Sequence, residues 1–162
     1  MSSIEERLAA LEQIVAGMQH SGHEAPSVTP GAEPYWILRG LQEKAPRGVV
    51  AFAGHVGEPA GPVEWQWERP TDELLDQDWG PATGALEALA HPVRLHLLQR
   101  VLNGAHTTAG LATTEELGTT GQLHHHLRTL VSAGWLESPA RGKYRVPGQR
   151  IIPLLVIISA TA

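Results

Sequence analysis

The chain has 162 residues, enough for one compact domain with an appendage or for two very small domains. It contains no cysteine, which excludes disulfides, thiolate metal sites and cysteine nucleophiles and fits a reducing cytoplasm. The amino terminus lacks the basic-then-apolar form of a signal peptide, and the longest apolar run, Ile151 to Ile158, is far shorter than the ~20 residues of a membrane span. We therefore expect a soluble, cytoplasmic protein with no membrane contact.

The net charge of −5 argues against a nucleic-acid partner until it is divided along the chain. Residues 1–82 hold 5 basic and 13 acidic side chains, a balance of −8, whereas residues 83–162 hold 7 basic and 4 acidic ones, a balance of +3. An asymmetry of this kind is typical of a module that faces nucleic acid beside a separate acidic body.

The first 19 residues carry a short heptad pattern of apolar side chains. A coiled coil between protomers and an amphipathic helix that packs on its own domain both remain open, because two heptads are too short to be stable alone. Residues 20–34 are rich in Pro, Gly and Ser, which indicates a linker. The heptad positions are Ile4, Leu8, Leu11, Val15 and Met18.

Residues 35–82 predict a short helix followed by a β-hairpin. Residues 35–41 form the helix, 48–56 the first strand and 63–68 the second, which places Val63, Trp65 and Trp67 on one face. The aromatic side chains either form a pocket for a small effector or help a small sheet to bury area, and the packing interpretation is favoured. The pocket residues would be Trp36, His55, Trp65 and Trp67.

The acidic run from Thr71 to Trp79 predicts a capped helix or turn. Its four carboxylates are interpreted as a solvated face that suits the helix dipole and not as catalytic groups. The sequence contains no recognisable catalytic arrangement, so we predict neither enzyme activity nor a cofactor.

Three helical patterns follow. Residues 91–102 form a helix with Pro92 in its first turn, and 108–117 form a weaker helix. Residues 119–130 form a third, capped by Thr119 and ended by Gly134. Its inward stripe is Leu123, Leu127, Leu130 and Val131.

The other face of the third helix is polar and precedes a basic hairpin. Residues 135–138 and 144–146 predict two short strands joined by residues 139–143. Side chains of this kind hydrogen-bond bases and phosphates. The candidate DNA-contacting residues are Thr119, Thr120, Gln122, His124, His125 and Arg128 of the helix and Arg141 and Lys143 of the wing, 139–145.

The run Ala88-Leu-Ala-His-Pro-Val-Arg-Leu-His-Leu-Leu98, together with residues 119–136, resembles the ArsR-type (ArsR/SmtB-like) winged helix-turn-helix transcription regulators. The likeness covers roughly residues 85–146. It implies a homodimer that reads a two-fold-related operator, and it does not imply a metal, because the cysteine pairs common before the recognition helix in metal sensors are missing here.

Three consecutive histidines, His124 to His126, suggest a metal site at first sight. On a helix such side chains point about 100° apart and cannot jointly bind one ion. We predict no metal, although a histidine and carboxylate site between subunits remains open. His124 and His125 are expected to face DNA, and His126 to be a partly buried packing residue.

Residues 149–162 could form a strand or a helix. Their β-branched residues favour a strand, whereas the ArsR resemblance implies a helix at the dimer interface, with Pro153 tolerated in a first turn. We predict the helix.

The sequence thus predicts an α+β, mainly helical fold: a winged helix-turn-helix with an amino-terminal helix and an extra β-hairpin module. The segments are an amphipathic or coiled-coil helix over 1–19, a linker over 20–34, a helix plus β-hairpin module over 35–82, a winged helix-turn-helix DNA-binding domain over 83–148 and a C-terminal dimerisation helix over 149–162. The predicted function is a sequence-specific DNA-binding transcriptional regulator, a repressor, acting as a homodimer or higher homo-oligomer on double-stranded DNA, with a small-molecule effector as a further partner. The alternative is a winged-helix adaptor that binds protein and not DNA.

Overall fold

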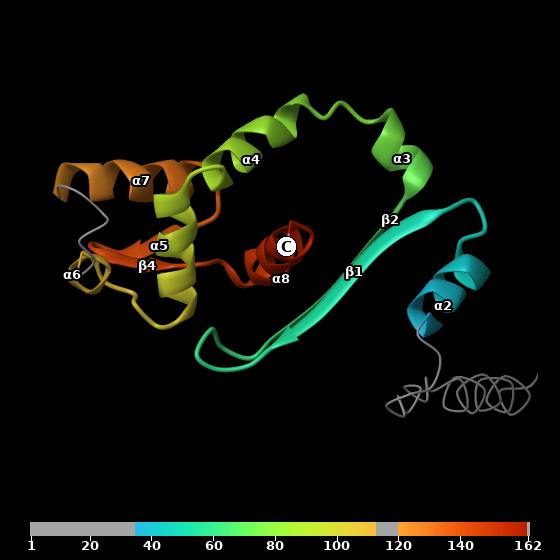
Figure 1. The fold of residues 1–162 in the computed structure, drawn as a ribbon, viewed down its shortest axis with the longest axis horizontal. Coiled ribbons are helices and arrows are strands. Elements are labelled where there is room, and N and C mark those ends of the chain that lie inside the picture. The colour runs from blue at the N-terminus through green and yellow to red at the C-terminus, as the bar shows by residue number, and fades with distance from the viewer. Residues whose placement is uncertain (1–34, 113–119, 162) are drawn as a thin grey trace, which may run out of the picture. The chain divides into compact units, whose positions relative to one another are not determined.

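The computed structural model describes residues 35–112 and 120–161 (Figure 1). The predicted amino-terminal helix and linker lie outside the described residues, as do Thr119 and residues 113–117 of the weaker helix. The chain divides into two compact units, Met1–Gly40 and Leu41–Ala162. Helix α2 (Trp36–Lys44) begins in the first unit and ends in the second. Among the described residues, every helix is too short or too polar to cross a membrane.

The second unit begins with a long antiparallel hairpin of β1 (Val49–Val56) and β2 (Val63–Pro70). Phe52 lies opposite Trp67 and Gly54 opposite Trp65. Because side chains alternate along a strand, the two tryptophans share a face with Phe52, while Glu64, Gln66 and Glu68 lie on the other. This is the predicted alternation, and β2 extends two residues further than predicted.

Short helices connect this hairpin to the following bundle: α3 (Thr71–Asp76), the 3-10 turn η1 (Gly80–Ala82) and α4 (Thr83–Leu89). The sequence did not predict α4. Its carboxyl end is held by Arg94, whose Nε donates to the carbonyl of Ala88 at 2.6 Å and whose guanidinium also donates to the carbonyl of Glu87 at 2.7 Å. These bonds occupy carbonyls in the last turn of the helix, and the carbonyl of Glu87 also accepts from the N–H of Ala90.

The core of the second unit forms where α5 (Pro92–Leu102), α6 (Thr108–Leu111) and α7 (Thr120–Ser132) meet. Pro92 opens α5, as predicted, because its missing N–H needs no partner there. The helical spacing of apolar residues brings one side of each helix into the core. The buried side chains are Leu97, Leu98, Val101, Leu111, Leu123, Leu127 and Leu130.

The prediction that Val131 belongs to the buried stripe of α7 was wrong. Val131 is 37% exposed, whereas Leu123, Leu127 and Leu130 are buried. At about 100° per residue, Val131 lies about 80° around the helix from Leu123, beyond the edge of the stripe.

Helix α7 ends at Ser132, and Gly134 follows it as the predicted terminating glycine. Gly134 has a left-handed backbone with φ 73°, and the N–H of Trp135 donates to the carbonyl of Leu130 at 2.9 Å. The chain then turns inward, so that Trp135 and Leu136 are buried, and the indole N–H of Trp135 donates to the carbonyl of Ala85 in α4 at 2.8 Å.

A second, shorter hairpin follows, made of β3 (Glu137–Ala140) and β4 (Lys143–Arg145). The strand predicted over 135–138 begins two residues later, because Trp135 and Leu136 are part of the buried exit turn. The connection is correspondingly tighter than predicted: Ala140 pairs with Lys143, and Gly142 takes a left-handed conformation with φ 70°.

The chain ends in α8 (Gly148–Ser159), which confirms the predicted helix over the strand. Pro153 lies inside this helix, beyond the first turn in which it was expected. Ile151, Ile152 and Leu154 are buried, and α8 packs on both strands of the β1–β2 hairpin (Figure 1). The hairpin predicted within the 35–82 module therefore belongs to the same compact unit as the helices after it. The fold is α+β and mainly helical.

Candidate nucleic-acid interface

The outer face of α7 carries the polar residues singled out by the sequence. Leu123, Leu127 and Leu130 fix its rotation by filling the core, and this directs the opposite side to solvent. Gln122, His124, His125 and Arg128 are exposed around that side, and Thr120 is exposed as the first residue of the helix. The structure thus presents together every predicted helix residue that lies within the described residues.

The β3–β4 turn presents a second group. Arg141 and Lys143 are exposed on either side of Gly142. The turn is tied to the start of α6, because the N–H of Thr108 donates to the carbonyl of Gly142 at 3.0 Å and Thr107 bridges to Lys143. The two basic side chains therefore extend from an anchored backbone.

The two groups lie toward the same end of the second unit. In the view of Figure 1, α6, the β3–β4 turn and the first turn of α7 are at one end, while the β1–β2 hairpin packs on α8. At the base of the β3–β4 hairpin, the carboxylate of Glu137 is paired with Arg145, which offsets its negative charge. A ligand that spans α7 and the turn would thus meet mainly cationic and hydrogen-bonding groups.

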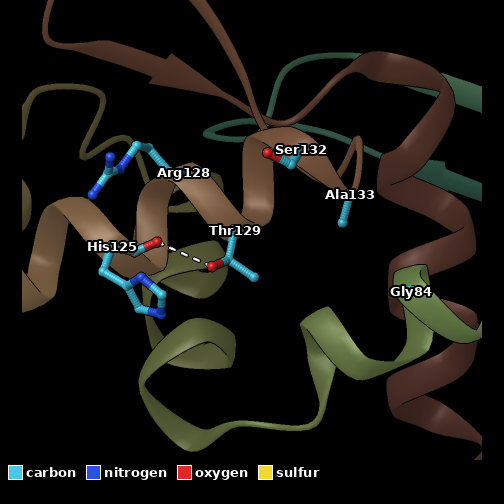
Figure 2. A pocket seen from close by; sticks show the side chains of 6 residues that line it. All are labelled: Gly84, His125, Arg128, Thr129, Ser132 and Ala133. Atoms are coloured by element: carbon cyan, nitrogen blue, oxygen red, sulfur yellow. Dashed lines mark hydrogen bonds between the residues drawn. The ribbon is translucent and has the colours of Figure 1, made fainter.

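A hollow of about 570 Å³ lies beside this face, between α7 and α4 (Figure 2). His125 and Arg128 extend from α7 in different directions, and Gly84 of α4 lies across the hollow. The hydroxyl of Thr129 donates to the carbonyl of His125 at 3.1 Å, so this hydroxyl is bonded to the backbone of its own helix. Thr129, Ser132 and Ala133 complete the lining.

Behind the face, His126 joins α7 to the start of α5. Its ring lies 4.7 Å from the ring of His91 and 5.7 Å from that of His125. His91 caps α5, because its Nδ1 accepts a hydrogen bond from the N–H of Val93 at 3.2 Å. His126 is half-buried, in agreement with the packing role expected for it.

The surroundings of His126 disfavour its charged form. Burial is the main cause, and His91, Arg94 and His125 add to it, so that the pKa of His126 is held below the ordinary value of 6.5. Its Nδ1 is buried and has no hydrogen-bond partner among the described residues. At neutral pH this ring is therefore an uncharged part of the packing between α7 and α5.

Within residues 35–112 and 120–161, no group of three or more histidine or carboxylate side chains could hold a metal ion. His124 and His125 are exposed and point from α7 to solvent.

The predicted effector-pocket residues are only partly brought together. Trp65 and Trp67 line a hollow with Phe52 of β1 and the first turns of α8. His55 lies on the opposite face of the hairpin, where its Nδ1 is 3.2 Å from a carboxylate oxygen of Glu64. Trp36 belongs to the first compact unit, so the hollow is built from the second unit alone.

Sequence reasoning missed several residues of these sites. His91 was included in a helix and not recognised as its cap, although a polar residue directly before Pro92 is a cap signal. Phe52, Gln149 and Arg150 were missed beside the tryptophans, because only the docking of α8 on the hairpin places them there.

No protein-family model matches the chain, and none of the curated proteins matches it either.

Proposed function

We propose that the second unit contains a winged helix-turn-helix of the ArsR type and that the protein is a sequence-specific DNA-binding transcriptional regulator. In this assignment α6 and α7 form the helix-turn-helix, α7 is the recognition helix, and the β3–β4 hairpin is the wing. The observation that carries the proposal is the two-sided character of α7. One side is buried through Leu123, Leu127 and Leu130, while the other is exposed and carries Gln122, His124, His125 and Arg128.

The chemistry of the exposed side suits the major groove of DNA. Gln122 reads base edges as an amide that donates and accepts hydrogen bonds, and His124 contacts a neighbouring base. Thr120, His125 and Arg128 contact phosphates, which positions the helix without reading sequence. The basic wing residues Arg141 and Lys143 add further phosphate contacts.

The proposal includes a homodimer that binds two half-sites about 10 base pairs apart. A single module with a balance of +3 over residues 83–162 makes few phosphate contacts, and a second copy doubles them. We assign the contact between copies to α8, where Leu155 and Ile158 are 37% and 41% exposed next to α5. The simplest outcome is repression by occupying a promoter.

Selection of bound sequences from random DNA with the purified chain tests the function. We expect enrichment of inverted half-sites with two-fold symmetry. Gln122→Ala should then lose preference at one position of each half-site, at about 1–3 kcal/mol per contact. Enrichment of no sequence would contradict the proposal and favour the protein-binding adaptor.

Sedimentation tests the dimer separately. Leu155→Asp should shift the chain toward monomer and weaken binding to the paired half-sites. Leu86→Asp, on an exposed leucine of α4 (53%), is the matched control and should leave the association unchanged. A monomeric wild-type protein would contradict the homodimer. A dimer that is insensitive to Leu155→Asp would show that α8 is not its interface.

A further inference from the structure

The hollow between the β1–β2 hairpin and α8 has the size of a small-molecule site. Its volume is about 430 Å³, within the range of about 300–1,000 Å³ usual for ligand pockets. We call it the Trp–Arg hollow. It is lined by Phe52, Trp65, Trp67, Gln149, Arg150 and Pro153.

One wall of the Trp–Arg hollow is aromatic. The rings of Phe52 and Trp67 lie 5.6 Å apart, and Trp65 follows on the same face of β2. Trp65 and Trp67 are still 37% and 41% exposed. The guanidinium of Arg69 lies over the Trp67 ring, 5.7 Å from its centre. Rings that served only to bury area for the hairpin would be covered by α8, so the part of the two rings that stays exposed is the aromatic surface offered to a planar ligand.

The part of the lining contributed by α8 provides a cation. Arg150 is half-buried, and its guanidinium carbon lies 5.0 Å from the ring centre of Trp135. Among the described residues, no carboxylate lies within ion-pair distance of Arg150, whereas Arg47, Lys44 and Arg145 each have one. A guanidinium in a half-buried position favours a planar anion that it can bind through two parallel hydrogen bonds.

The β1–β2 hairpin and α8 approach each other closely at Gly54. Gly54 of β1 faces Ile152 of α8, and a Cβ on Gly54 would lie 2.7 Å from the Ile152 Cδ1 atom. The absence of a side chain at Gly54 thus lets the hairpin dock on α8, and Trp65, Trp67 and Arg150 line the same hollow.

We propose that the Trp–Arg hollow binds a small aromatic carboxylate, with the ring against Trp65 and Trp67 and the carboxylate on Arg150. The amide of Gln149 supplies a further hydrogen bond. This site is separate from the outer face of α7, and binding there does not depend on the proposed DNA binding.

Calorimetric titration of the full chain without DNA tests the site, with 1-naphthoate as the probe and its neutral amide, 1-naphthamide, as the comparison. We expect the carboxylate to bind with a Kd on the order of 0.1 mM. The amide keeps the rings but lacks the charge, so it should bind on the order of 10-fold more weakly. This comparison uses the wild-type protein alone and is independent of whether any variant folds.

Variants then assign the contacts. Arg150→Gln should weaken 1-naphthoate to the level of the amide, Trp67→Leu should weaken both compounds, and Arg47→Gln, the matched loss of charge outside the hollow, should change neither. Thermal melting of each variant confirms that it is folded. Failure of 1-naphthoate to bind, equal binding of acid and amide, or binding unchanged by Arg150→Gln would overturn the proposal.

A second copy of the chain is the competing occupant of this surface. Sedimentation of Trp67→Glu distinguishes it. A shift from dimer to monomer, together with no binding of 1-naphthoate to the wild type, would assign the hollow to self-association and overturn the ligand proposal.

Discussion

The two hairpins of the second unit have the same antiparallel topology and opposite chemistry. The β1–β2 hairpin is long, turns an aromatic face to α8 and an acidic face to solvent, and contacts the rest of the unit mainly through α8. The β3–β4 hairpin is short and directly follows the buried residues Trp135 and Leu136. Its basic turn is hydrogen-bonded to the start of α6. The two hairpins thus differ in the part of the unit that they pack against and in the charges that they carry.

The largest expected effect compares one tryptophan from each hairpin region. Trp135→Ala should lower the free energy of unfolding by about 3–5 kcal/mol, because the ring is 2% exposed and its N–H is bonded to Ala85. Trp67→Ala, at 41% exposure, should lower it by only about 1 kcal/mol. Urea denaturation measures both changes. Equal losses of unfolding free energy would contradict the inference that the short hairpin is joined to the core more firmly than the long one.

The next effect concerns the docking of the long hairpin. Gly54→Ala should lower the free energy of unfolding by about 1–3 kcal/mol, since the new Cβ would overlap the side chain of Ile152. Gly57→Ala is the control on the same hairpin, because nothing lies within 4 Å of its Cβ position. If both variants unfold at the same urea concentration, the hairpin is not held by this contact.

The short hairpin has a corresponding position at its turn. Gly142→Ala should cost about 1–2 kcal/mol, because its φ of 70° is unfavourable for a residue with a side chain. Asn tolerates this region better, so Gly142→Asn should unfold closer to wild type. Equal stability of Gly142→Ala and wild type would indicate that the turn is not held in this conformation.

Salt titration of the proposed DNA binding compares the basic turn with the acidic hairpin. Arg141→Ala and Lys143→Ala should each make the dependence of log K on log salt shallower, by about 0.9 for each phosphate that the variant no longer neutralises. Arg47→Ala also removes an exposed charge, at the base of the long hairpin, and should leave the slope unchanged. A slope altered by all three variants would mean that the wing has no special part in binding.

The smallest effect is a dependence of stability on pH. His126 in the unfolded chain takes up a proton near its ordinary pKa of 6.5, whereas in the folded protein the pKa is lower, mainly because of burial. The unfolded state therefore binds more protons in this interval, and the free energy of unfolding should fall as the pH decreases below about 6.5. His126→Gln should flatten this dependence in denaturation curves recorded between about pH 7.5 and about pH 5. An unchanged slope would place the titrating group elsewhere.

The sequence predicted best what depends on local periodicity. The spacing of Leu123, Leu127 and Leu130 was enough to orient α7, and the alternation of Val63, Trp65 and Trp67 was enough to orient β2. Gly134 ended the helix because few other residues adopt its backbone conformation. The predicted boundaries of helices and strands were less accurate where tertiary packing decides them. Trp135 and Leu136, for example, were predicted as part of a strand but are buried in the core before β3 begins.

The features that depend on distant parts of the chain could not be predicted. Arg150 follows the wing in sequence, and nothing local indicates that it shares a hollow with Trp65 and Trp67. The contact between His91 and His126 likewise depends on how α5 crosses α7. The expectation that His55 would join the tryptophans failed because it took no account of the strand register, which places His55 on the other face.

The position of Arg150 has one more consequence. Its guanidinium nitrogen lies 3.7 Å from where a Cβ of Gly134 would be, at the carboxyl end of α7, where the helix dipole is negative. A carboxylate bound to Arg150 would neutralise the charge that faces this helix end. If the same helix holds an operator, thermodynamic reciprocity requires that the acid change the affinity for the operator by the same factor by which the operator changes the affinity for the acid.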